Sequence, residues 1–96
     1  MQIYSLLPTS WQDYLKTLDK ESYKQAFDVL RMILLEDDMD YADRVLKETL
    51  RHNSTSPEAI AITYKRLKEN YPNGYIFPKD QMDFETWRTK QLGKAV

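Results

Sequence analysis

The sequence predicts an all-α domain: a four-helix antiparallel bundle or paired helical hairpins, followed by an extended aromatic C-terminal tail with at most one short fifth helix. Three observations lead to this class. The 96 residues include only 2 glycines and 4 prolines, too few for the many turns of a β-sandwich. Apolar residues recur at helical spacing in four separate segments. The connections between these segments are short, which makes successive helices run roughly antiparallel.

The first two helices are expected at residues 9–18 and 20–36. The apolar face of the first is formed by Trp11, Tyr14, Leu15 and Leu18. Asp19 is placed to cap the second helix, whose apolar stripe is the broadest in the chain. That stripe contains Tyr23, Ala26, Phe27, Leu30, Met32, Ile33, Leu34 and Leu35. Its breadth predicts that the second helix is the most buried and lies at the centre of the bundle.

The third and fourth helices are expected at residues 40–52 and 57–70. Asn53 is expected to cap the end of the third. Ser56 is the expected N-cap of the fourth, with Pro57 as its first residue, where a missing N–H costs nothing. The apolar face of the third helix is formed by Ala42, Val45, Leu46, Thr49 and Leu50. That of the fourth is formed by Ile60, Thr63, Tyr64 and Leu67. Residues 1–70 therefore form the predicted bundle.

Residues 71–96 are expected to form an extended, partly helical tail. The turn-forming residues 72–74 end the fourth helix, residues 75–78 should be extended, and a short helix is expected around 84–92 with Asp83 as its cap. The tail has too few aliphatic residues to build its own core. Its aromatic side chains either pack on the bundle or dock on a partner protein. The candidate docking residues are Tyr75, Phe77, Phe84 and Trp87.

No residue of this chain is predicted to be catalytic or to bind a cofactor. The absence of cysteine excludes a disulfide framework, a thiolate metal site and a cysteine nucleophile. The sequence contains no glycine-rich phosphate loop, and no serine lies in the strand–turn–helix context of a hydrolase nucleophile. The lone His52 lies at a helix end, where a cation interacts favourably with the helix dipole.

A run of acidic residues between the second and third helices is the one candidate for a metal site. It consists of Glu36, Asp37, Asp38, Asp40 and Asp43. A calcium loop that began at Asp37 would place Met39 and Tyr41 where oxygen ligands are needed, and Ala42 where glycine is needed. We therefore predict no metal site, and expect these acids to cap the third helix and to favour its positive N-terminal end.

The charge distribution gives only weak support to nucleic-acid binding. Residues 1–48 carry six basic and ten acidic side chains, for a net charge of −4, and residues 49–96 carry eight and five, for +3. A nucleic-acid surface usually shows a denser basic face. Phosphate contacts are predicted, if anywhere, at Lys65, Arg66 and Lys68, because the fourth helix opens with acidic and apolar residues where a base-reading helix would meet the groove.

Neither membrane insertion nor export is predicted. No apolar run approaches the roughly 18 residues that a transmembrane helix needs. The first seven residues lack the basic region and apolar core of a signal peptide. The expected location is the cytoplasm.

The order of residues resembles one known family, the IstA-type transposases of insertion sequences that also encode an AAA+ ATPase. Three segments carry the resemblance: LLPTSW at 6–11 with YL at 14–15, ADRVL at 42–46 with TL at 49–50, and SPEAI at 56–60 with YKRL at 64–67. The first is similar to the region just past the catalytic and β-rich parts of these DDE-family enzymes. The others are similar to the two helices that follow, with patterns A-x-x-V-L…A-L and S-x-x-x-I…Y-x-x-L.

The resemblance implies a non-catalytic C-terminal assembly domain of a bacterial transposase. The family's DNA-recognition helices and acidic catalytic triad lie upstream and have no counterpart in this chain. The implied partners are a second copy of the domain, the remainder of the transposase, or the AAA+ ATPase. Two alternatives remain open: an accessory nucleic-acid-binding domain, and a free-standing small regulatory protein of a mobile element.

Overall fold

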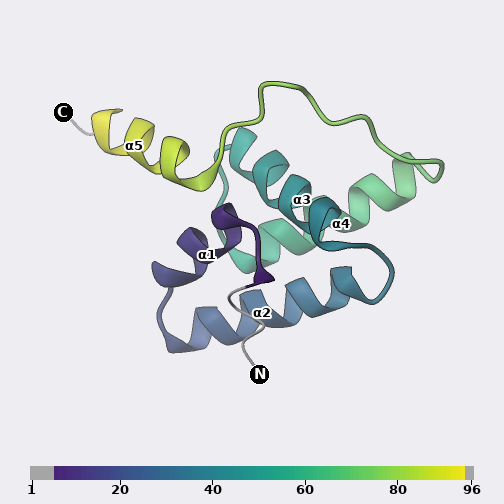
Figure 1. The fold of residues 1–96 in the computed structure, drawn as a ribbon, viewed down its shortest axis with the longest axis horizontal. Coiled ribbons are helices and arrows are strands. Elements are labelled where there is room, and N and C mark those ends of the chain that lie inside the picture. Colours follow the sequence, from purple (N-terminus) through teal and green to yellow (C-terminus); the bar gives the residue numbers. More distant parts are fainter. Residues whose placement is uncertain (1–5, 95–96) are drawn as a thin grey trace.

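The computed structural model describes residues 6–94 and shows an all-helical fold, which confirms the predicted class. No described residue belongs to a β-strand. The helices are α1 (Thr9–Lys16), α2 (Lys20–Leu34), α3 (Met39–Arg51), α4 (Pro57–Asn70) and α5 (Phe84–Lys94). Helices α2, α3 and α4 alternate in direction, so α2 and α4 run side by side in the same direction (Figure 1). Residues 71–83 have no helix and pass along α3 toward α5.

Side-chain caps determine where four of the helices begin. Each cap oxygen accepts a hydrogen bond from the backbone N–H three residues later, which satisfies a donor that the first helical turn leaves unpaired. The caps are Asp19 in α2, Asp38 in α3, Ser56 in α4 and Asp83 in α5, with N–O distances of 2.8, 2.9, 3.1 and 2.8 Å. The caps predicted at Asp19, Ser56 and Asp83 are confirmed, as is the short fifth helix.

The acidic residues between 36 and 43 do not all have the same role. Asp38 caps α3 and Asp40 lies in its first turn, as predicted. Glu36 and Asp37 do not cap α3, because both carboxylates face the Tyr64 hydroxyl of α4. The expectation that the whole run serves the start of α3 is therefore wrong for these two residues, which join the α2–α3 connection to α4. It is also wrong for Asp43, which lies beyond the first turn of α3 and pairs with Lys47 at 3.0 Å.

Asn53 ends α3 in the way the sequence predicts. It has a φ of 60°, a left-handed conformation that asparagine tolerates better than most residues. Its N–H donates to the Leu50 carbonyl at 2.8 Å, and the Ser54 N–H donates to the Thr49 carbonyl at 3.3 Å. This pair of bonds is the Schellman arrangement, which satisfies the last carbonyls of α3 and turns the chain toward α4.

The central helix is α3, so the prediction that the second helix is central is wrong. Helix α3 packs against α1, α2, α4 and α5. Its buried side chains are Ala42, Val45, Leu46, Glu48, Thr49 and Leu50, whereas α2 fully buries only Ala26, Leu30 and Ile33. The broad apolar stripe of α2 exceeds what its neighbours cover. Part of it, including Met32 and Leu35, therefore remains accessible at the surface.

Helix α1 is fixed to the bundle by aromatic side chains. Trp11 is fully buried, and its indole N–H donates to the Ala42 carbonyl of α3 at 2.8 Å. The Tyr14 hydroxyl donates to the Thr55 carbonyl in the α3–α4 connection. The Tyr14 ring also lies between Trp11 and Phe84, with centroid distances of 5.8 and 5.6 Å and edge-to-face geometry. These contacts tie α1 to α3 and α5 at once.

The tail packs on the bundle, which changes the prediction for its aromatic residues. Phe77 and Phe84 are only 8% and 4% exposed and belong to the common core, so they are not available to dock a partner. Tyr75 and Trp87 are half-buried against the same core. Phe77 meets the Tyr41 ring of α3 edge to face at 5.5 Å. The segment that could not build its own core has thus added its aromatic rings to the existing one.

Candidate protein-docking groove

The three predicted phosphate contacts do not form one free basic surface. Lys65 and Arg66 are exposed on α4. Lys68 is not free: its Nζ lies 3.2 Å from Asp37 Oδ2 and near the rings of Tyr41 and Tyr64, at 5.6 and 6.0 Å from their centroids. Asp37 therefore offsets the charge of one of the three cations, and the remaining pair is weaker support for nucleic-acid binding.

Glu48 of α3 is a buried charge that the sequence analysis did not single out. Its carboxylate accepts hydrogen bonds from Arg51 Nε and Nη2 at 3.1 and 2.9 Å. It also lies 3.3 Å from the Tyr75 hydroxyl and 3.4 Å from Gln81 Nε2. Burial alone would raise the pKa of Glu48, but the hydrogen bonds and charge of Arg51 keep this pKa below its ordinary value. This network fastens residues 71–83 to α3.

The Glu48→Gln variant is expected to lose about 1–3 kcal/mol of unfolding free energy at neutral pH, because neutral glutamine replaces a charged acceptor. The pKa of Glu48 is lowered in the folded state. Its contribution is therefore complete above the ordinary value of about 4.3 and is lost as the pH falls through the folded-state pKa. Urea unfolding of both proteins at a series of pH values measures this. A difference between them that does not shrink on acidification would contradict the assigned role.

The main apolar concavity lies between the C-terminal half of α2 and α4. It has a volume of about 540 Å³, and its lining is mostly apolar. The lining residues are Met32, Leu35, Glu36, Tyr64, Lys65, Lys68 and Glu69. Leu35 is 85% exposed at its edge, although it is a large apolar side chain. We call this feature the α2–α4 groove.

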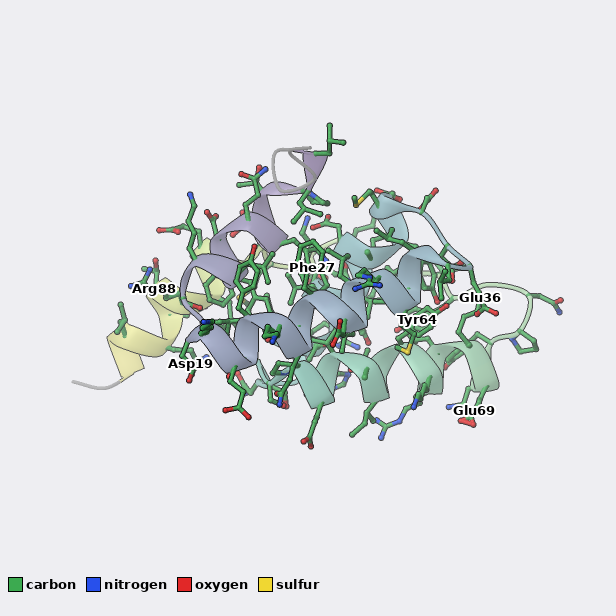
Figure 2. The ribbon with its side chains drawn as sticks, turned by 90° about the horizontal axis from the view of Figure 1, so that it is seen from below. Asp19, Phe27, Glu36, Tyr64, Glu69 and Arg88 are labelled. Carbon is green, nitrogen blue, oxygen red and sulfur yellow. The ribbon has the colours of Figure 1, made fainter. Side chains whose placement is uncertain are left out.

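Hydrogen bonds between the α2–α3 connection and α4 make the groove a preformed feature. The Tyr64 hydroxyl donates to Asp37 Oδ2 at 2.8 Å and lies 3.2 Å from Glu36 Oε2. Figure 2 shows Glu36, in the connection after α2, and Tyr64 of α4 facing each other, with Glu69 farther along α4. Burial, and then the Asp37 charge, raise the pKa of Tyr64, so this hydroxyl keeps its proton and remains a donor.

The residues that line the groove carry equal numbers of positive and negative charges, and Asp37 adds one more negative charge beside them. Two lysines and two glutamates line the groove. Lys68 is paired with Asp37, and Glu36 faces the Tyr64 hydroxyl. Lys65 and Glu69 are both exposed and one turn apart on α4, but neither forms an ion pair with any residue between 6 and 94. The order explains this, because Lys preceding Glu by four residues is the weaker arrangement of such a pair.

The comparisons with known proteins identify no relative. No family model, no curated protein and no solved structure matches this chain. Within residues 6–94, no group of three or more histidine or acidic side chains is placed to hold a metal ion. None of the helices in that range is both long and apolar enough to cross a bilayer.

Proposed function

We propose that this chain is a non-catalytic protein-interaction domain whose α2–α4 groove binds an amphipathic helix of a protein partner. The observation that carries the proposal is the unpaired apolar surface at the groove, above all the 85% exposure of Leu35 beside Met32 and Tyr64. An exposed apolar concavity with a polar rim is the usual form of a protein-binding site.

The shape and charge of the groove both favour a helix with a neutral polar face. The groove is bounded by two helices that run side by side in the same direction, which gives it the form of a trough. An amphipathic helix can lay its apolar stripe into such a trough. The groove is lined by two lysines and two glutamates, and Asp37 pairs with one of the lysines, so the rim offers no attraction to a polyanion and nucleic acid is the weaker candidate.

The resemblance of residues 6–67 to the C-terminal helical region of IstA-type transposases gives this proposal a biological setting. In that setting the domain acts in the cytoplasm and helps to assemble a transposase on the ends of its transposon. The helix in the groove is then supplied by a component of the transposition machinery. The domain contributes contacts, and the catalytic residues belong to another part of the machinery.

A designed helical peptide with a leucine stripe and alternating lysine and glutamate residues tests the groove directly. We expect it to shift the backbone amide resonances of Met32, Leu35, Tyr64 and Lys65 in a titration followed by NMR. The Leu35→Gln variant should bind the peptide about tenfold more weakly, because burial of most of a leucine side chain is lost. Leu35 is already exposed, so this variant should fold normally.

The matched control is Leu92→Gln on α5, where a leucine is 64% exposed far from the groove. This variant should bind the peptide as the parent protein does. Equal weakening by both substitutions, or peptide-induced shifts that cluster outside α2 and α4, would remove the groove as the docking site.

A further inference from the structure

We infer that the α2–α4 groove is covered by the same face of a second copy of this chain, with the two α4 helices antiparallel about a two-fold axis. This inference rests on the proposed function and names its partner. It starts from Lys65 and Glu69, the two rim charges that form no ion pair with any residue in the described range 6–94.

Lys65 and Glu69 are arranged for exchange between two copies. They lie one turn apart on the same side of α4 and carry opposite charges. In a two-fold symmetric dimer, a contact from residue i to residue j is always repeated from j to i. Antiparallel α4 helices therefore bring Lys65 of each copy to Glu69 of the other, and one arrangement satisfies all four charges. A partner of unrelated sequence would need a separate match to each charge.

The apolar centre of the groove fits the same symmetry. Leu35 and Met32 line the groove beside Lys65 and Glu69, so they lie near the axis that relates the two copies. The exposed Leu35 of each copy then packs against the apolar surface of the other.

The size of the surface indicates a weak dimer. A standard stable interface buries about 800 Å² on each partner. The α2–α4 groove is only a small part of a total surface of 6528 Å². We therefore expect a reversible equilibrium with a dissociation constant above about 1 µM. Such a contact becomes effective when larger assemblies bring several copies together.

Charge exchange on α4 tests the inference by sedimentation equilibrium at concentrations up to the millimolar range. The parent chain should form a reversible dimer. Lys65→Glu alone and Glu69→Lys alone should each weaken the dimer about tenfold or more, since each places like charges opposite one another twice. The double variant Lys65→Glu/Glu69→Lys should restore the affinity to within about threefold of the parent, because the swapped charges match again. Lys65 and Glu69 are both exposed in the monomer, so the substitutions should not disturb the fold. Circular dichroism of each variant checks this.

The outcomes separate this inference from the proposed function. A double variant as weak as the single variants, or a parent chain that stays monomeric throughout, overturns the α4 pairing. If the monomeric parent still binds the designed peptide in the groove, the docking function stands and only the second copy is wrong. If neither the dimer nor the peptide complex forms, both proposals fall.

Discussion

The Trp11→Ala variant is expected to lose about 3–5 kcal/mol of unfolding free energy. Trp11 is completely buried, and its indole N–H is bonded to the Ala42 carbonyl of α3. The substitution leaves a large cavity at the junction of α1 and α3. It also removes the edge-to-face contact between the Trp11 and Tyr14 rings. The total unfolding free energy of a domain of this size is about 5–15 kcal/mol, so the variant should be partly unfolded at moderate temperature. Urea denaturation followed by circular dichroism measures the loss.

The Trp11→Phe variant separates packing from hydrogen bonding. It keeps most of the ring volume but removes the indole N–H together with part of the second ring, so the expected loss is about 1–2 kcal/mol. A loss as large as that of Trp11→Ala would mean that the bond to Ala42, rather than the packing of the ring, holds α1 in place.

The Phe84→Ala variant is expected to lose about 3 kcal/mol of unfolding free energy. This is near the lower end of the range for truncation of a buried phenylalanine, because α5 is the terminal helix. Phe84 is 4% exposed, meets the Tyr14 ring at 5.6 Å and stacks on Trp87 at 5.9 Å. Removal of its ring detaches α5 from α1. Thermal unfolding and amide hydrogen exchange in α5 report on this directly.

The Leu92→Ala variant is the control within the same helix. Its side chain is largely exposed, and the expected change is within about 0.5 kcal/mol. If Phe84→Ala were equally neutral, the tail would be an appended segment rather than part of the core. The alternative that its aromatic residues dock on a partner would then return.

Local features of the fold could be predicted from the sequence, whereas the central helix could not. The caps at Asp19, Ser56 and Asp83 depend only on residues within one turn, so the sequence contains all the information they need. The choice of central helix depends on which stripes the neighbours cover. The α2 stripe has more large apolar residues, but small residues such as Ala42 allow other helices to approach α3 closely.

The α2–α4 groove could not be predicted from the sequence for a related reason. The groove forms because α2 and α4 lie side by side, and a helical period does not indicate which helices become neighbours. The same holds for Lys68, whose partner Asp37 is 31 residues away. Glu48 gave a partial signal, since Arg51 and His52 follow it by three and four residues. Its contacts with Tyr75 and Gln81 depend on the path of residues 71–83.

The position of α3 has a consequence for how the domain comes apart. Because α1, α2, α4 and α5 each pack on α3, no pair of helices has an apolar core separate from the rest. Loss of α3 would expose the inner faces of all its neighbours together. Partial unfolding to a stable hairpin is thus disfavoured, and the transition between the native and denatured states should be all-or-none. We therefore expect the five helices to unfold as one cooperative unit, although the sequence shows them as a series of separate amphipathic segments.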